Sequence, residues 1–600
     1  MAFSTVSRMF NQVTLDHGDR ELYHYKNNDS WVGISGKEIR GIVKNLSFGL
    51  KSMGIGKGDN VSLLSTNSPR WAMSDYGIIC SGAATVGIYP TLIASQIEYI
   101  INDSNSKVIF VENQDQLIKI KEIWSNCPQL SHVIVMDDSV DDGDDKISSF
   151  STFSKRGVDF NGNSEEGFDS LTNIAKPDDL LTLIYTSGTT GNPKGVMLTH
   201  GNIMSNVEGV SRLIEFDQNE KFLSFLPLSH VFERMGGHFT AFSMGSIVYY
   251  AESIETVPDN LQEVKPSIVL SVPRLYEKMY ARVREGLKSA PEARQKIFWW
   301  AINVGKQATE YRLQNKSLPL MLGLKHKIAN KLVYGKVKDR VGGNLRFFMS
   351  GGAPLSKEIA EFFAAADITI LEGYGLSETS PVLTTNSPGN IRFGAVGKSL
   401  FNVDIRIADD GEILAKGPNI MVGYFNNEDA TKEAIDEDGW FHTGDIGHLD
   451  DDGYLFITDR KKNILITAAG KNVAPAPMEN ALVSSSYIEQ SVVIGDKRNF
   501  IGALVVPAFD AVKSHLKEMG KEFSSNDEII ADSDANALIR SEIDAAMENF
   551  SNYERIKEFS LLPRLLALEN GELTPTLKVV RKVVLKNFSD QVDAIYSNSN

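Results

Sequence analysis

LIYTSGTTGNPKGVMLTHGN, the stretch from Leu183 to Asn202, joins an apolar run of strand character to a turn rich in glycine and hydroxyl residues. The apolar run ends at Tyr185, and the turn that follows contains Thr186, Ser187, Gly188, Thr189, Thr190 and Gly191, with Lys194 just beyond. Glycines let backbone N–H groups converge on an anion, while the hydroxyls add donors and the lysine adds charge. The stretch therefore predicts a phosphate-binding loop after a strand.

The spacing of this loop differs from the GxxxxGK[ST] pattern, because Pro193 stands five residues after Gly188. A kinase or a GTPase-type ATPase is therefore disfavoured. A flexible Gly/Ser/Thr linker is the alternative. Linkers seldom carry Pro-Lys-Gly directly before a hydrophobic segment, so the loop is the better interpretation.

Around this loop, short apolar runs alternate with helical patterns. The runs predicted to be buried strands are VSLLS from Val61, KVIFV from Lys107, HVIVM from His132, LLTLIYT from Leu180 and LRFFMS from Leu345. Apolar residues at three- and four-residue steps predict helices, as in the segment that begins at Gly36. The alternation predicts an α/β fold with largely parallel sheets covered by helices.

A chain of 600 residues is too long for one core. A Gly- and Asp-rich segment gives way to the basic cluster Arg460-Lys461-Lys462, after which a new α/β pattern begins. We expect two domains, residues 1–459 and residues 460–600.

Charge and cysteine content restrict the classes of function. The 61 Lys and Arg against 77 Asp and Glu give a formal net charge of −16, which disfavours general binding to nucleic acid. Cys80 and Cys127 have no metal-ligand spacing and indicate reduced thiols. The sequence has neither a signal-peptide pattern nor an apolar run long enough to span a membrane. We expect a soluble, cytoplasmic protein.

One region is basic within this acidic chain. Residues 274–346 contain 17 Lys and Arg against 5 Asp and Glu, and include an amphipathic segment from Ala293 to Leu313. One interpretation is a helical insertion in which Phe298, Trp299 and Trp300 pack inward. The other is a surface for anionic lipid headgroups or for the phosphates of a nucleotide-like cosubstrate.

The segment YTSGTTGNPKGV resembles the phosphate-binding signature of the adenylate-forming (AMP-binding) superfamily, which includes acyl-CoA synthetases, peptide-synthetase adenylation domains and luciferases. Companion motifs follow in the expected order, and the resemblance runs from about residue 20 to residue 590. It implies a large N-terminal domain of layered sheets and helices with a small, mobile α/β C-terminal domain.

Two further motifs match the adenine-binding part of this superfamily. EGYGLSETSP, from Glu372, resembles the adenine and magnesium motif, which implies that Tyr374 stacks on adenine and that Glu378 carries Mg²⁺ with help from Thr186. Carboxylate and hydroxyl oxygens suit such a hard cation. SGGAPLS, from Ser350, resembles the loop over the other face of the base. The nucleotide-binding residues implied by the two motifs are Gly352, Ala353, Glu372, Gly373, Tyr374, Gly375 and Ser377.

Later motifs match the ribose contacts, the hinge and the catalytic lysine. GWFHTGDIG, from Gly439, implies that Asp445 accepts hydrogen bonds from the ribose hydroxyls, and Arg460 matches a second nucleotide contact. Lys462 matches the position about which the C-terminal domain swivels. Lys578 matches the lysine that bridges the substrate carboxylate and the α-phosphate, although Leu577 replaces the glycine of many members and Lys582 is the nearest rival.

The acyl motifs resemble those of long-chain fatty acyl-CoA synthetases. FLPLSHVFER, from Phe225, implies that His230 lies near the acyl carboxylate and Phe232 near the chain, although a histidine in such a run is also compatible with a core position. SVPRLYEKMY, from Ser271, places Tyr276 where some long-chain enzymes have an aromatic gate. The segment around Gly470 is implied to meet the pantetheine arm of coenzyme A.

The sequence is therefore interpreted as a long-chain fatty acid–CoA ligase. The expected reaction uses ATP and Mg²⁺ to make an acyl-adenylate and pyrophosphate, then transfers the acyl group to coenzyme A with release of AMP. The alternatives are an acyl-AMP ligase that acylates a carrier protein and a silent nucleotide- or lipid-binding protein on the same scaffold. The sequence leaves open a homodimer and peripheral contact with a membrane.

Overall fold

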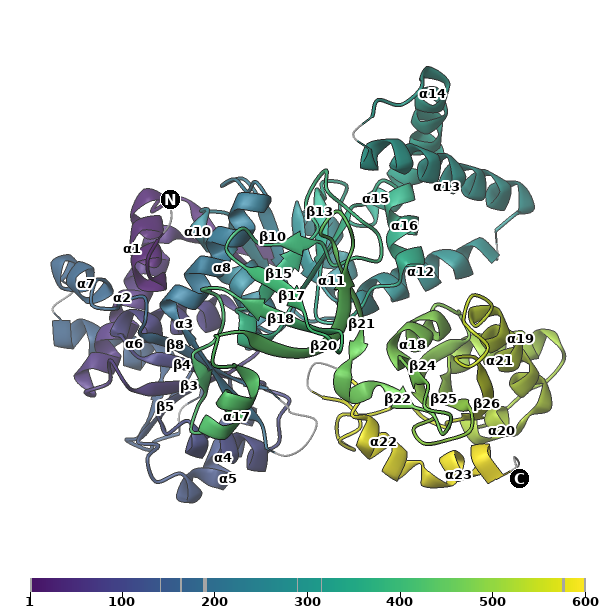
Figure 1. The fold of residues 1–600 in the computed structure, drawn as a ribbon. Coiled ribbons are helices and arrows are strands. Elements are labelled where there is room, and N and C mark those ends of the chain that lie inside the picture. Colours follow the sequence, from purple (N-terminus) through teal and green to yellow (C-terminus); the bar gives the residue numbers. More distant parts are fainter. Residues whose placement is uncertain are drawn as a thin grey trace.

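The computed structural model describes residues 3–140, 142–161, 164–186, 192–288, 290–314, 316–574 and 578–597. The residues from Ser187 to Gly191, at the tip of the predicted phosphate loop, lie outside this part, as do residues 575–577. The chain forms a large body that carries a projecting helical arm and a smaller body near the C-terminus (Figure 1).

One sheet of the large body has eight strands in the order β19-β9-β8-β4-β3-β5-β6-β7. Its strands are β3 (Asn60–Leu64), β4 (Ala84–Ile88), β5 (Ser106–Val111), β6 (His132–Val135), β7 (Ile147–Ser149), β8 (Leu180–Thr186), β9 (Lys194–Thr199) and β19 (Gly423–Tyr424). The neighbouring strands from β8 to β7 are parallel, and β9 and β19 are antiparallel additions. The strands predicted near Val61, Lys107, His132 and Leu180 are confirmed.

The second sheet of the large body has nine strands in the order β16-β15-β14-β13-β12-β10-β11-β1-β2. They are β1 (Glu21–Asn27), β2 (Ser30–Ser35), β10 (Lys221–Ser224), β11 (Ile247–Tyr250), β12 (Ile268–Ser271), β13 (Phe347–Ser350), β14 (Ile370–Gly375), β15 (Val382–Thr385) and β16 (Lys398–Ser399). Strands β12, β13 and β14 are parallel, with Ser350 opposite Glu372. The loops that follow β13 and β14 therefore leave the same edge, where ligands bind in open α/β sheets.

Helices cover and separate these sheets, and the largest core contains side chains from both. The helices are α1 (Val6–Asp16), α2 (Gly36–Ser52), α3 (Pro69–Ser81), α4 (Ala94–Asp103), α5 (Gln114–Ile123), α6 (Phe150–Asn161), α7 (Glu165–Thr172), α8 (His200–Leu213), α9 (Val231–Glu233), the π-helix η2 (Arg234–Thr240), α10 (Ala241–Ser243), α11 (Val257–Val264) and α16 (Lys357–Ala365). The helix predicted from Gly36 is confirmed, and it begins with a capping box between Ser35 and Glu38.

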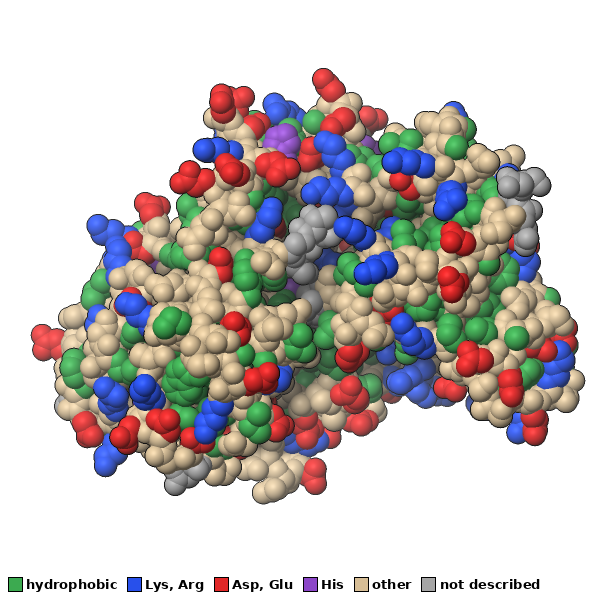
Figure 2. All heavy atoms as spheres, turned by 90° about the horizontal axis from the view of Figure 1, so that it is seen from below, with side chains coloured by type: hydrophobic (Ala, Val, Ile, Leu, Met, Phe, Trp, Pro, Cys, Tyr) green, Lys and Arg blue, Asp and Glu red, His purple; other side chains and the backbone are tan. Residues whose placement is uncertain are grey.

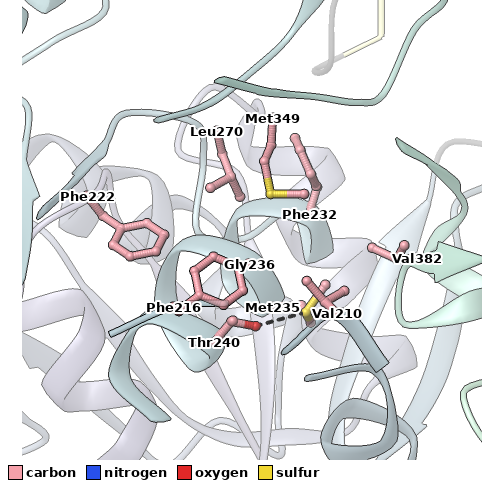
Figure 3. Close-up of a pocket in the computed structure, with 10 residues that line it drawn as sticks. All are labelled: Val210, Phe216, Phe222, Phe232, Met235, Gly236, Thr240, Leu270, Met349 and Val382. Atoms are coloured by element: carbon pink, nitrogen blue, oxygen red, sulfur yellow. Dashed lines mark hydrogen bonds between the residues drawn. The ribbon is translucent and has the colours of Figure 1, made fainter. Parts of the chain in front are cut away.

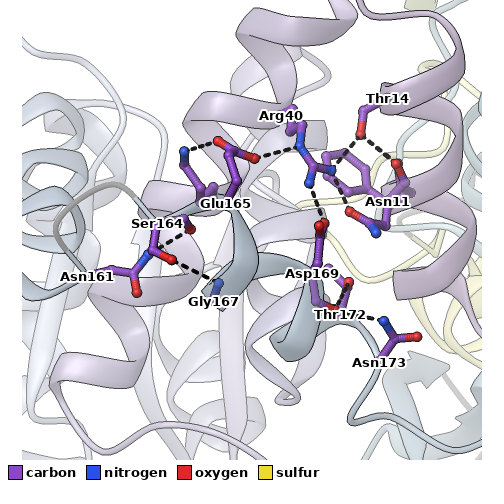
Figure 4. Close-up of polar contacts among 12 residues, drawn as sticks. Asn11, Thr14, Arg40, Asn161, Ser164, Glu165, Gly167, Asp169, Thr172 and Asn173 are labelled. Carbon is purple, nitrogen blue, oxygen red and sulfur yellow. Dashed lines mark hydrogen bonds and ion pairs between the residues drawn. The ribbon is translucent and has the colours of Figure 1, made fainter.

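A buried arginine joins three of these helices (Figure 4). Arg40 of α2 donates to Glu165 Oε2 (3.1 Å) and Asp169 Oδ1 (2.7 Å) of α7, and to Thr14 Oγ1 (3.2 Å) of α1. The fork of guanidinium donors suits several acceptors at once. Arg40 thus fixes α1 and α7 on α2, next to the eight-stranded sheet.

A four-stranded sheet completes the large body, and a connecting segment leads to the smaller one. Its strands are β17 (Asp404–Ile407), β18 (Glu412–Lys416), β20 (Phe441–Leu449) and β21 (Leu455–Arg460), with helix α17 (Glu428–Ala434) between β18 and β20 in the sequence. A short 3₁₀ helix, η5 (Lys461–Asn463), follows β21 directly. Lys461 forms ion pairs with Asp410 (2.6 Å) and Glu412 (3.0 Å), which anchor this segment on the large body.

The smaller body has its own apolar core, with buried residues from Leu465 to Ile595. Its sheet is β24 (Ile488–Ile494), β25 (Ile501–Pro507) and β26 (Ile556–Leu561), with the ribbon β22 (Leu465–Ile466) and β23 (Asn472–Val473) near its start. The helices are α18 (Pro475–Val483), α19 (Phe509–Glu518), α20 (Asn526–Ala531), α21 (Ser533–Ala546), α22 (Arg581–Asn587) and α23 (Ser589–Ser597). The α/β fold class expected from the sequence is confirmed.

The basic region forms the projecting arm in Figure 1. It consists of α12 (Pro273–Lys288), α13 (Glu292–Leu313), α14 (Leu320–Ala329), the π-helix η3 (Asn330–Tyr334) and α15 (Gly335–Asp339). Phe298 of α13 is buried, as expected for an inward-packed helix, but Trp299 and Trp300 are 46% and 37% exposed. Of the two interpretations, the one in which all three aromatic side chains pack inward holds for Phe298 only, because α13 turns only one face toward α16. Within the described ranges, no helix is long and apolar enough to span a membrane.

A fully buried ion pair connects the segment around His230 to the eight-stranded sheet. Arg234 of η2 donates to Asp75 of α3 through Nε (2.9 Å) and Nη2 (2.5 Å). Its Nη1 donates to Thr182 Oγ1 of β8 at 2.6 Å. Burial alone would raise the pKa of the Asp75 carboxyl, but the neighbouring Arg234 and His238 together outweigh it and keep this pKa below its usual value. The pair holds η2 against the strand that leads into the phosphate loop.

We predict that Arg234→Met lowers the free energy of unfolding by about 3–5 kcal/mol, because the buried Asp75 carboxylate then loses its permanent counter-charge and keeps only Thr85 and His238 as polar neighbours. Urea denaturation measures the change. The matched control is Arg212→Met, which removes the exposed ion pair with Glu208 and is expected to cost about 0.5 kcal/mol or less. Equal losses for the two variants would contradict a structural role for the buried pair.

Candidate active site

The ends of the phosphate loop are held by antiparallel pairing. Thr186, the last residue of β8, lies opposite Lys194, the first residue of β9. The predicted ligands Ser187, Gly188, Thr189, Thr190 and Gly191 connect these two positions and lie outside the described residues. The pairing brings a hydroxyl and an ammonium group to the two sides of the loop entrance.

A tyrosine connects the loop lysine to the predicted metal ligand. The Lys194 ammonium lies 4.8 Å from the centre of the Tyr424 ring, and the Tyr424 hydroxyl donates to Glu378 Oε1 at 2.8 Å. Burial and the neighbouring Glu378 charge raise the pKa of the Tyr424 phenol, so it remains a donor. Glu378 lies in the 3₁₀ helix η4 (Ser377–Thr379), which packs against β9. Lys194, Tyr424 and Glu378 therefore form one group from three elements.

Sequence reasoning missed Tyr424. The residue ends β19, a two-residue strand within a segment rich in glycine and asparagine. Such a short strand has no hydrophobic periodicity, and a single tyrosine there resembles any surface aromatic residue. Its role follows only from the pairing of β19 with β9, which the sequence does not reveal.

The predicted ribose contact lies beside the predicted adenine contact. The Tyr374 hydroxyl donates to Asp445 Oδ2 at 2.7 Å, and Arg460 Nε lies 3.2 Å from Asp445 Oδ1. Asp445 and Arg460 are partners in the antiparallel pairing of β20 and β21, which fixes their spacing. Burial raises the pKa of the Asp445 carboxyl, and the charge of Arg460 opposes this rise.

The adenine motifs lie at the ends of adjacent parallel strands. Gly352 and Ala353 form an exposed turn after β13, and Gly352 has a positive φ of 81° that favours glycine. Gly375, at the end of β14, has no room for a side chain, because a Cβ would lie 1.7 Å from the Pro381 carbonyl oxygen. Burial raises the pKa of Glu372 to about 8, so this carboxyl is protonated at neutral pH. Gly373 and Ser377 are half-buried in the same segment.

The C-terminal lysine reaches the same group of charges from the smaller body. Lys578 is exposed at the edge of the site, yet protein atoms surround its ammonium. This burial lowers its pKa, and Arg460 lowers it further, while Asp445 and Glu378 oppose the shift. The rival Lys582 lies in α22 and is also exposed. The Lys578 ammonium therefore lies within electrostatic range of Asp445, Glu378 and Arg460.

His230 lies within electrostatic range of Lys578 and has a defined tautomer. Its Nδ1 accepts a hydrogen bond from the Phe232 backbone N–H at 3.2 Å and caps α9. Burial lowers the pKa of His230 to about 4, and the positive charge of Lys578 adds to this effect. The ring is therefore neutral at physiological pH, and because Nδ1 accepts, the proton is on Nε2. His230 offers one N–H donor to an acid bound beside Lys578.

The donor set near the phosphate loop fits a magnesium ion. In the described part of the chain, no three His, Cys, Asp or Glu residues gather as a metal-binding group. Glu378 supplies one carboxylate and Thr186 one hydroxyl. Mg²⁺ is usually held by one or two carboxylates together with substrate phosphates and water, so this sparse set suits it.

A small apolar cavity lies in the large body and includes Phe232 in its lining (Figure 3). It lies between α8, η2 and the strands β10, β12 and β13, and is lined by Val210, Phe216, Phe222, Phe232, Met235, Gly236, Thr240, Leu270, Met349 and Val382. Phe232 packs on Gly351, because a Cβ at Gly351 would lie 3.1 Å from its ring. Tyr276 does not line this cavity. It is fully buried against the rings of Phe348 (5.3 Å) and Phe363 (6.1 Å).

Two predicted residues lie away from this group. Lys462 is exposed in η5, beside the anchored Lys461. Gly470 is exposed in the turn between β22 and β23, has a φ of 74° and has no atom near the position of a Cβ. Seen from below, several Lys and Arg side chains lie beside the hollow in the middle of this face (Figure 2). The hollow therefore offers an entrance suited to an anionic ligand.

Family models match both bodies of the chain. The model described as AMP-binding enzyme matches residues 10–425, and the model described as AMP-binding enzyme C-terminal domain matches residues 462–600. Among curated proteins, the chain is 35% identical to long-chain-fatty-acid–CoA ligase FadD15 of Mycobacterium bovis, over 99% of this chain and 97% of that protein. It is 32% identical to long-chain-fatty-acid–CoA ligase ACSBG1 of Homo sapiens, over 99% of this chain and 85% of that protein.

Solved structures share the fold. The anthranilate CoA ligase AuaEII in complex with anthranoyl-AMP matches with a TM-score of 0.74, at 19% identity and over 99% of both chains. A Mycobacterium tuberculosis fatty acyl CoA synthetase matches with a TM-score of 0.60, at 21% identity, over 98% of this chain and 99% of that one.

We predict that Tyr424→Phe weakens binding of ATP in the presence of Mg²⁺ by roughly tenfold or more. A hydrogen bond to a charged carboxylate contributes roughly 1.5–3 kcal/mol, and its loss frees Glu378 to leave the loop. Calorimetric titration measures the affinity. Tyr553→Phe, at an exposed position in the smaller body, is the control and should bind ATP normally. Unchanged affinity in Tyr424→Phe would contradict this role.

Proposed function

The chain belongs to the AMP-binding enzyme family, and from this membership we infer that it is a long-chain fatty acid–CoA ligase. The reaction consumes ATP and coenzyme A and releases AMP and pyrophosphate. The observation that carries this inference is the 35% identity, along nearly the whole of both chains, to a protein named for that activity. The charged groups around Lys578 supply the residues that such chemistry requires.

In the first half-reaction, the fatty carboxylate attacks the α-phosphorus of ATP. We propose that Lys194, Thr186 and the loop between them bind the phosphates, while Asp445 binds the ribose hydroxyls and Tyr374 the adenine. Mg²⁺, when bound through Glu378 and Thr186, would offset phosphate charge. The hydrogen bond from Tyr424 supports this role, because it orients the Glu378 carboxylate toward the loop.

Lys578 and His230 are proposed to act on the reacting carboxylate. Attack of a carboxylate on a polyanion brings like charges together, so the reaction needs a cation at the point of contact. The ammonium of Lys578 meets this need, and its position near Asp445 and Glu378 supports the assignment. Neutral His230 donates from Nε2 to a carboxylate oxygen and orients the acid without adding a second charge.

The acyl chain is proposed to enter between α8 and η2, where the apolar cavity of about 10 Å³ would have to widen to take it. Phe232 lies at the end of the cavity nearest to Gly351 and the adenine turn, and Phe222 lies toward the other end in Figure 3. Each buried methylene contributes about 0.8 kcal/mol, roughly fourfold in affinity, which favours long acids. The role of Tyr276 as a gate to the acyl site stays a prediction. Because its side chain is buried beside β13, it would have to move in order to open or close such a site.

For the second half-reaction we propose a rotation of residues 460–600 against residues 1–459. Lys461 is fixed to the large body by two ion pairs, whereas the next residue, Lys462, is exposed, which supports a pivot there. The rotation would withdraw Lys578 and bring the turn at Gly470 to the cleft, where the thiol of coenzyme A attacks the acyl-adenylate. The described conformation, with Lys578 at the site, corresponds to the first half-reaction.

We propose a cytoplasmic location, with the enzyme at a membrane that supplies its apolar substrate. Cys80 and Cys127 are buried free thiols, which suits a reducing compartment. Burial raises the pKa of the Cys127 thiol to about 11, so it stays protonated. A homodimer remains a prediction.

We predict that Lys578→Ala abolishes ATP–pyrophosphate exchange, because the charge that offsets the attack is lost. Conversion of pre-formed acyl-adenylate to acyl-CoA should continue, since that step needs no contact between carboxylate and phosphate. Lys582→Ala is the matched control and should keep both half-reactions. If exchange survives in Lys578→Ala and fails in Lys582→Ala, the two lysines have been assigned in the wrong order.

We predict that Phe222→Ala shifts the preferred acid toward longer chains. The lost ring leaves room for further methylenes, each able to raise affinity by about fourfold. The measurement is kcat/KM for a series of saturated acids, with AMP release as the readout. Hexanoate is the internal control, because its short chain is expected to end before Phe222. An unchanged optimum would mean that the chain binds elsewhere.

A further inference from the structure

The helical arm exposes an unusual amount of apolar surface at its tip. Leu320 is 94% exposed, and four other large apolar side chains of α14 and η3 are also exposed: Met321, Leu324, Ile328 and Leu332. The opposite face of the same helix is apolar as well and is buried, through Leu322, Ala329 and Val333. A water-exposed helix of a globular protein normally has a polar outer face. This part of the arm has apolar residues on both the buried face and the exposed face.

The exposed residues form a continuous stripe. Leu320, Leu324, Ile328 and Leu332 are spaced by four residues, and side chains at this spacing lie above one another on one side of a helix. The helix continues from α14 into η3 without a break, so the stripe runs over three turns. We call these four residues, with Met321, the outer stripe.

Lysines flank the outer stripe on both sides. Successive residues of a helix are separated by about 100°. Lys325 follows Leu324, whereas Lys327 and Lys331 precede Ile328 and Leu332, so they lie on opposite flanks. All three are exposed. Residues 311–338 contain 7 Lys and Arg and no Asp or Glu, in a chain whose net charge is −16.

The combination identifies the class of partner. An apolar stripe between rows of lysine suits the surface of an anionic bilayer, where apolar side chains enter the acyl boundary and ammonium groups meet the headgroups. A second copy of the arm is a poor partner for the stripe, since it would bring two rows of like charge together. The stripe lies on a helix at the tip of an arm that projects from the large body, so a flat surface can reach it (Figure 1).

We propose that the outer stripe and its flanking lysines dock this protein on anionic membranes. The helix lies in the plane of the bilayer surface, with the outer stripe inserted and Lys325, Lys327 and Lys331 at the headgroups. This inference rests on the proposed function only for its purpose, which is access to a fatty acid that resides in the membrane. The binding itself requires neither ATP nor catalysis.

The test is co-sedimentation of the full chain with vesicles of phosphatidylcholine containing phosphatidylglycerol, at physiological ionic strength. We expect binding that falls as the salt concentration rises and is much weaker on pure phosphatidylcholine. Leu324→Gln with Ile328→Gln should reduce the partition constant by at least tenfold, because the inserted apolar area is lost. Lys327→Gln with Lys331→Gln should reduce it by about fivefold for each charge removed.

Ile254→Gln is the matched control, since it removes an exposed aliphatic side chain outside the arm and should bind vesicles as the unaltered chain does. Ligase activity toward octanoate in solution should be the same in all variants. Failure to bind anionic vesicles, with ligase activity retained, overturns the docking surface and leaves the proposed function intact. Stripe-dependent dimers without vesicle binding also overturn it. Vesicle binding without ligase activity supports the surface and refutes the proposed function.

Discussion

The site depends on opposite charges that two separate bodies bring to one place. Asp445, Glu378 and Arg460 belong to the large body, and Lys578 belongs to the smaller one. The lowered pKa of Lys578 reflects the cost of burying its ammonium next to Arg460, which the two carboxylates only partly offset. The two cations and the two carboxylates balance, so the group has no surplus of negative charge to favour the buried ammonium. A triphosphate bound as proposed would add counter-charge and so favour this closed arrangement.

The large body positions its share of the site through buried polar contacts. Arg234 holds η2 against Thr182 of β8, so the segment with His230 and the strand before the phosphate loop form one rigid unit. His230 caps the short helix α9 immediately before η2, which fixes its ring. Phe232, two residues after His230, lines the apolar cavity. One buried ion pair thus sets the position of the segment with His230 relative to the strand that leads into the predicted phosphate loop.

The sequence predicted the parts whose signals are local. Apolar runs and helical spacing predicted the α/β class, because hydrophobic periodicity is set by residues that are close together in the sequence. Site residues such as Lys578 and Asp445 came from a resemblance, and the structure brings them together. The role of Tyr424 could not be predicted, since a two-residue strand shows no hydrophobic periodicity. Arg234 and Asp75 are separated by 159 residues, and neither shows its partner in sequence. The sequence around Trp299 and Trp300 predicts a helix whether these side chains are exposed or buried, so it did not reveal their exposure.

The helical arm carries the outer stripe at its tip and also contacts the smaller body, which is proposed to rotate. Arg274 of α12 forms an ion pair with Glu489 of β24 in the smaller body. Lys288 of α12 donates through Nζ to Ser486 Oγ and Tyr487 Oη of the smaller body, each at 3.3 Å. These contacts exist in the conformation that has Lys578 at the site. The proposed rotation that withdraws Lys578 would carry Glu489 away from Arg274, so these contacts would break in each cycle. They are partly exposed, which keeps their contribution small enough to be reversible. An arm fixed at a bilayer would then hold the large body still while the smaller body turns.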